Sequence, residues 1–61
     1  MENNTFDQIG FNSWLDQLEE FLLSIYWPEE EAAEQRSREI WTSYFQKSIN
    51  PIEAFFEEQS K

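Results

Sequence analysis

The fold is decided by residues 12–28, which read NSWLDQLEEFLLSIYWP. Apolar side chains recur there at intervals of three and four residues, the period of one face of an α-helix. We therefore predict an amphipathic helix over residues 13–26, with Ser13 as its N-cap. Pro28 ends it, because the residue before a proline is pushed out of helical geometry. The predicted apolar stripe consists of Trp14, Leu18, Phe21, Leu22 and Ile25.

A second helix is predicted over residues 28–48. Pro28 suits the first position of a helix, where the amide hydrogen that proline lacks is not needed. The glutamates that follow complement the positive end of the helix dipole. Its predicted inward face consists of Ala33, Ser37, Ile40, Trp41, Tyr44, Phe45 and Ser48.

Residues 51–59 are predicted to form a short third helix. Asn50 is a favoured N-cap and Pro51 takes the first helical position. Glu53 stands where a capping box places its acidic residue. The expected fold is therefore a small all-α domain of three helices, an antiparallel pair closed by a short C-terminal helix.

The polar N-terminal segment is expected to contribute little to this fold. We assign residues 12–61 to a single helical domain and residues 1–11 to a flexible or loosely docked segment. Thr5 and Gln8 have the spacing of a capping box, which would allow one short turn within that segment.

Composition excludes several classes of function. Among the 61 residues are thirteen Asp and Glu, four Lys and Arg, and no Cys or His, for a net charge of −9. Disulfides, thiolate zinc sites and the usual nucleophile–base pairs are therefore excluded, so we predict no enzymatic activity, no metal and no cofactor. Direct binding to nucleic acid or to an anionic membrane is disfavoured by charge repulsion. No basic signal region and no apolar stretch of membrane-spanning length is present, which makes a cytoplasmic location the default expectation.

The acidic residues suggest a function in binding. Carboxylates four residues apart on a helix lie about 6 Å apart, close to the spacing of phosphates along a nucleic-acid strand. We hypothesise that the protein occupies a basic, nucleic-acid-binding surface of a protein partner and so inhibits or regulates it. The simpler alternative is that the charge provides solubility only. The predicted contact residues are Asp16, Glu19, Glu20, Glu29, Glu30, Glu31 and Glu34.

The eleven aromatic residues suggest a second kind of interface. They exceed what a three-helix core of this length is expected to enclose, and exposed apolar area commonly marks a binding site. We predict an exposed patch of Trp27, Phe55 and Phe56, which would make the protein an assembly adaptor or accessory subunit. A second copy of the chain is one candidate occupant, giving a homodimer. Small acidic helical proteins are also common among phage-encoded inhibitors and antitoxins, but this likeness is one of size and charge, without a shared motif.

Overall fold

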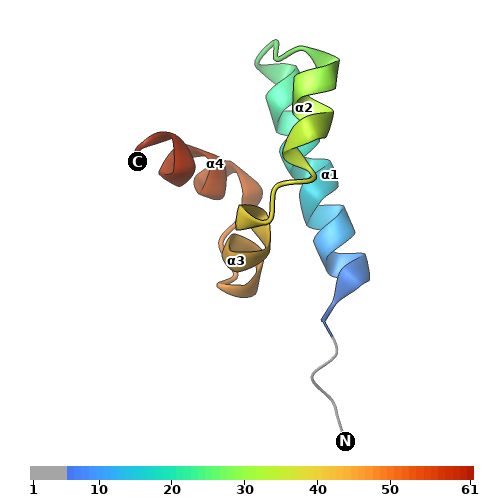
Figure 1. Cartoon of the computed structure of the whole chain (residues 1–61), viewed down its shortest axis with the longest axis vertical. Helices are drawn as coiled ribbons and strands as arrows, with labels where there is room; N and C mark the ends of the chain where they lie inside the picture. The colour runs from blue at the N-terminus through green and yellow to red at the C-terminus, as the bar shows by residue number, and fades with distance from the viewer. Residues whose placement is uncertain (1–5) are drawn as a thin grey trace, which may run out of the picture.

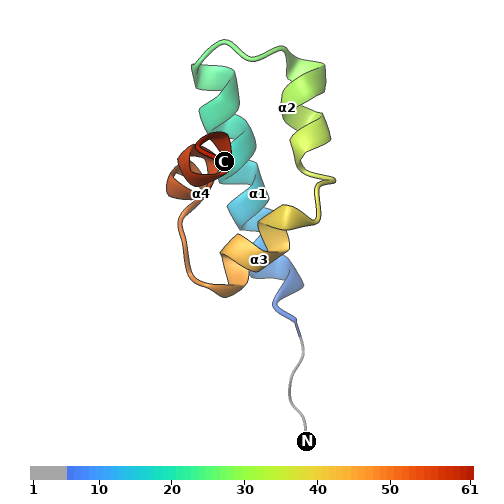
Figure 2. The same cartoon turned by 60° about the vertical axis from the view of Figure 1, so that its left-hand side comes forward.

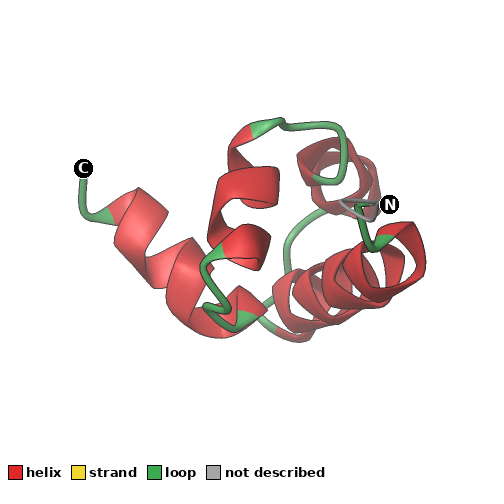
Figure 3. Cartoon of the chain, turned by 90° about the horizontal axis from the view of Figure 1, so that it is seen from below, coloured by secondary structure: helices red, strands yellow, loops and turns green. Residues whose placement is uncertain are grey.

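The computed structural model describes residues 6–61 and places them in four helices joined by short turns (Figure 1). The described residues contain helices and loops and no strand (Figure 3). The predicted small all-α domain is therefore confirmed, with four helices in place of three. They are α1 (Gln8–Ser24), α2 (Glu29–Gln35), α3 (Ile40–Gln46) and α4 (Pro51–Gln59).

α1 is the longest helix, and each of the other three packs against it. α2 runs back beside α1 as a hairpin, so the predicted antiparallel pair is present in this part of the chain (Figure 2). α3 follows α2, and α4 packs against both α1 and α3. The last helix is thereby packed against the first.

α1 begins five residues earlier than predicted. Its N-cap is Asp7, whose carboxylate accepts a 2.9 Å hydrogen bond from the amide of Gly10, and Ser13 lies inside the helix. Gly10 has no positive φ angle and does not interrupt the helix. A Cβ atom at this position would clash with the Asp7 carboxylate, so a larger residue would displace the capping side chain. The proposed partner of Gln8 in a capping box, Thr5, lies outside the described residues.

The segment assigned to residues 1–11 therefore belongs partly to the domain. The first turn of α1 covers its last residues, and Phe11 is buried in the core. Phe6 precedes the helix and packs edge-on against Phe11 and Phe45, with ring centroids 5.4 and 5.7 Å away. Packing of these aromatic rings holds this end of the described chain against the domain.

α1 ends at Ser24, two residues before the predicted end. Tyr26 adopts a left-handed conformation with φ 71°, and the amide of Trp27 donates to the carbonyl of Leu22 at 3.1 Å. This is the hydrogen-bond pattern of a Schellman motif, which closes a helix by satisfying its last carbonyls. Pro28 is the N-cap of α2, whereas the prediction placed it at the first helical position.

The helix predicted over residues 28–48 is in fact two helices, α2 and α3. Ala32 and Trp41 are both fully buried, yet residues nine apart on a straight helix point in directions about 180° apart. A break between them lets both face the core. At Arg36, Ser37 and Arg38 the amides donate to carbonyls three residues earlier, which tightens the chain before it turns. Burial of the tryptophan outweighs the helical propensity of this segment, and the predicted inward residues Ala33, Ser37 and Ser48 are exposed.

The prediction for the last helix is confirmed. α4 spans Pro51–Gln59, and the side chain of Asn50 accepts a 2.8 Å hydrogen bond from the amide of Glu53. Pro51 takes the first helical position and is buried. Both capping residues therefore act as their positions in the sequence indicate.

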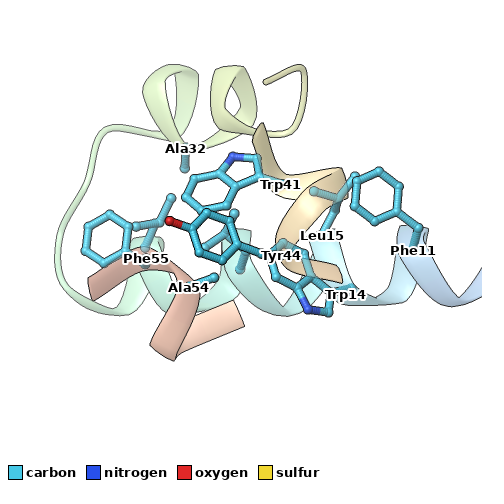
Figure 4. Close-up of a cluster of buried hydrophobic side chains, with 10 residues drawn as sticks. Phe11, Trp14, Leu15, Ala32, Trp41, Tyr44, Ala54 and Phe55 are labelled. Atoms are coloured by element: carbon cyan, nitrogen blue, oxygen red, sulfur yellow. The ribbon is translucent and has the colours of Figure 1, made fainter. Parts of the chain in front are cut away.

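Aromatic residues make up half of the ten buried core residues. Trp41 lies at its centre, fully buried, with Ala32 of α2 on one side and Tyr44 on the other (Figure 4). Trp14 and Tyr44 approach its ring at centroid distances of 6.0 and 5.7 Å. The remaining members of the buried cluster are Phe11, Leu15, Leu18, Leu22, Ala54 and Phe55.

Candidate partner-binding surfaces

The net charge of the protein comes from one part of the chain. Residues 1–35 contain nine Asp and Glu and no Lys or Arg, whereas residues 36–61 contain four of each. In the structure, α1 and α2 carry most of the first group, and α3 and α4 lie in the electrically balanced part. The α1–α2 hairpin is therefore the negative side of the molecule.

Two of the predicted acidic contact residues serve the fold. Asp16 and Glu19 on α1 both accept hydrogen bonds from Arg36, which follows α2, at 2.5 and 3.1 Å. Hydrogen bonding to Asp16 is the main cause that raises the pKa of Arg36 above its ordinary value. These ion pairs hold the hairpin together, and they reduce the charge that Asp16 and Glu19 offer to a partner.

The other five predicted acidic residues are exposed, as Asp16 is, and they lie outside these ion pairs. They constitute what we call the acidic surface of the α1–α2 hairpin. Three of them form the first turn of α2, where carboxylates stabilise the positive end of the helix. The members of the acidic surface are Glu20, Glu29, Glu30, Glu31 and Glu34.

The predicted aromatic residues come together but are mostly covered. The ring of Phe55 lies 5.7 Å from Trp27 and 5.8 Å from Phe56, measured between centroids. Phe55 is buried and Trp27 is half-buried, so Phe56, 57% exposed, is the most accessible of the three.

Five of the eleven aromatic residues are buried and six are not, so the core does not fully enclose them, as expected, but most of the six are partly covered. Nine of the eleven are buried or half-buried, and the two exposed ones are Phe56 and Tyr26. A fourth helix and edge-to-face packing make this enclosure achievable, because they allow rings to cover one another.

A shallow groove between α1 and α4 was not predicted. Phe21 lines it on the α1 side, and Ile52, which is 45% exposed, lines it on the α4 side. The ring of Phe56 lies 5.9 Å from that of Phe21, next to the groove. Ile52 and Phe56 are four residues apart on α4, a spacing that could have revealed this apolar edge. We give the name apolar groove to this site together with the adjacent Phe56; its lining residues are Gln17, Glu20, Phe21, Ser24 and Ile52.

A second, polar hollow lies between α3 and α4 and includes a serine and two lysines, Ser43, Lys47 and Lys61. A Ser–Lys pair would need a neutral amine as its base. The proximity of Tyr44, and after it the charge of Glu58, raises the pKa of Lys61 above its ordinary value, which favours the protonated ammonium group. Lys61 is therefore poorly suited to act as a general base.

Comparison with protein-family models, with curated proteins and with solved structures finds no match for this chain. Among residues 6–61, no helix combines the length and the apolar character needed to cross a membrane. The acidic surface and the apolar groove are the candidate binding surfaces of residues 6–61.

Proposed function

We propose that the protein binds a protein partner with a basic surface and thereby inhibits or regulates it, without catalysing a reaction. The supporting observation is the location of the whole net charge in residues 1–35, with five exposed carboxylates on the α1–α2 hairpin. Such a surface attracts Lys- and Arg-rich proteins over distances of about a Debye length and accelerates their encounter.

A nucleic-acid-binding site is the proposed target on the partner. Glu30 and Glu34 are four residues apart and exposed on α2, which gives their carboxylates a separation resembling that of consecutive phosphates. A site built to neutralise a row of phosphates would accept this row of carboxylates. Occupation of the site would block access for DNA or RNA.

The proposal is tested by charge reversal at two positions. Glu30→Lys with Glu34→Lys changes the acidic surface, and Glu39→Lys with Glu57→Lys is the matched control, since both residues are exposed and lie on the balanced half of the chain. We expect the first pair of substitutions to lower the affinity for a basic, nucleic-acid-binding partner at least roughly tenfold at low salt. The control pair should lower that affinity much less. DNA should compete with the wild-type protein. Equal effects of the two double variants would contradict the proposal.

A second candidate function is supported by the exposed apolar side chains of α4. Ile52 and Phe56 are 45% and 57% exposed, as expected for an assembly adaptor that binds through an apolar contact. Such a complex would be nearly insensitive to salt and would be lost in Phe56→Ala. A cytoplasmic location remains the default expectation for either function.

A further inference from the structure

We infer that the apolar groove between α1 and α4 is a docking site for an amphipathic helix of the partner whose apolar stripe is flanked by Lys or Arg. The inference rests on the proposed function, because it takes the partner to be basic. It adds which element of the partner docks, and where.

The shape and composition of the groove favour a helix. Phe21 on α1 and Ile52 with Phe56 on α4 give two apolar edges, one from each helix. A furrow between two helices accepts the apolar side chains of a third at positions i, i+3, i+4 and i+7. α4 has nine residues and is about 13 Å long, so two to three turns of the incoming helix would span it.

The charges around the groove favour basic residues beside the apolar stripe of that helix. Glu20 lines the groove on the α1 side, and Glu53, which follows Ile52 on α4, is exposed. The basic residues of the chain lie elsewhere: Arg36 binds Asp16 and Glu19, Arg38 and Lys61 pair with Glu58, and Lys47 lines the hollow between α3 and α4. None of them lines the groove. Lys or Arg beside the apolar stripe of the incoming helix would therefore meet Glu20 and none of these four basic side chains.

A second copy of the chain fits this site less well. Each copy carries a net charge of −9, and a symmetric contact would place the acidic margins of two grooves against each other. A standard interface also buries about 800 Å² on each partner, close to a fifth of the 4452 Å² accessible surface of this chain. Two half-exposed side chains on α4 and the half-buried Phe21 match a single short helix better.

The test uses a dye-labelled synthetic peptide of about 18 residues, five helical turns, with leucines on one stripe and lysines beside it. One control peptide has the same composition with scattered leucines, and another has Glu in place of Lys. We expect the first peptide to bind the full chain at least roughly tenfold tighter than either control in fluorescence anisotropy. Amide NMR shifts of the wild-type protein should change around Phe21, Ile52 and Phe56, which requires no variant.

Matched variants then locate the site. Ile52→Ser and Phe56→Ser should each weaken binding roughly tenfold, whereas Ile9→Ser and Tyr26→Ser should have less than about a twofold effect. The controls are apt because Ile9 and Tyr26 are even more exposed, at 84% and 94%, and lie outside the groove.

The outcomes separate this inference from the proposed function. If peptide affinity is unchanged by the α4 variants, if the scattered peptide binds equally well, or if the shifts concentrate on α2, the groove is not the site, and the acidic surface keeps its proposed role. A light-scattering mass of a dimer that Phe56→Ser converts to a monomer would assign the groove to a second copy and overturn the inference. If the groove binds the peptide as expected but reversal of Glu30 and Glu34 leaves the natural basic partner bound, the proposed function fails and the groove stands.

Discussion

The indole N–H of Trp14 donates a 2.8 Å hydrogen bond to the backbone carbonyl of Ile49, 35 residues away in the sequence. This bond connects α1 to the turn between α3 and α4. The same turn is fixed from the other side, because the amide of Ile49 donates to the carbonyl of Tyr44 at 3.1 Å. A single side chain of the first helix thereby holds the point at which the last helix begins.

Trp14→Phe should therefore destabilise the fold strongly. The substitution removes the donor, leaves the carbonyl of Ile49 without it, and opens a cavity where the buried indole was. We expect a loss of about 2–4 kcal/mol in the free energy of unfolding, measured by urea denaturation with circular dichroism. Trp27→Phe is the control, because Trp27 is half-buried, and it should cost less than about half as much. Equal losses would show that the Trp14–Ile49 bond does not carry this effect.

The pair of Asp7 and Gly10 should be energetically coupled. Gly→Ala inside a helix usually stabilises by about 0.5–1 kcal/mol, but at position 10 the new Cβ would displace the capping carboxylate of Asp7. We expect Gly10→Ala to be neutral or destabilising in the wild-type protein and stabilising in the Asp7→Ala background. A double-mutant cycle on thermal unfolding measures this difference. Additive effects of the two substitutions would mean that the cap is absent in solution.

The helices that carry strong local signals could be predicted from the sequence. Asn50 and Pro51 define the start of α4, because a cap and a proline act within a few residues of themselves. The break between α2 and α3 could not be predicted in this way. It has no proline or glycine, and it arises because Ala32 and Trp41 must both reach the same core.

Some features of the candidate surfaces could be predicted from the sequence, and others could not. The exposure of Glu30 and Glu34 follows from the cost of burying charge, which the sequence reveals. The ion pairs that Arg36 makes with α1 depend on how the hairpin packs, and so does the burial of Phe55. Because of such long-range contacts, Phe55 lies in the core, whereas the prediction placed it on the surface.

The left-handed conformation of Tyr26 should make a glycine preferable for stability at that position. A non-glycine residue at φ 71° is strained, and the side chain is 94% exposed and contributes little burial. We expect Tyr26→Gly to raise the free energy of unfolding by about 0.5–1 kcal/mol.

Ser13→Gly serves as the opposite control, and it also tests where α1 begins. Inside a helix this substitution should cost about 0.5–1 kcal/mol, whereas at an N-cap it would cost only a few tenths. Thermal unfolding of both variants decides the matter. A destabilised Tyr26→Gly would contradict the left-handed geometry, and a nearly neutral Ser13→Gly would restore Ser13 as the N-cap.

Arg36→Met should loosen the α1–α2 hairpin in a salt-dependent manner. The substitution removes both ion pairs to α1 and leaves Asp16 and Glu19 without their cation. We expect a loss of about 1 kcal/mol at low ionic strength, which shrinks in roughly 0.5 M NaCl because salt screens the pairs. Arg38→Met is the control: its 3.5 Å pair with Glu58 has a more exposed guanidinium, and its loss should be smaller.

The pH dependence of this contribution has a defined sign. Hydrogen bonding to Asp16 raises the pKa of Arg36 in the folded protein, so the arginine's share of the stabilisation is fully present below its unfolded pKa. It is lost only as the pH rises through the higher, folded value, in strongly alkaline solution. The difference in stability between the wild-type protein and Arg36→Met should therefore stay constant from about pH 7 to about pH 10. A difference that disappears within that interval would show that a group other than the guanidinium controls the hairpin.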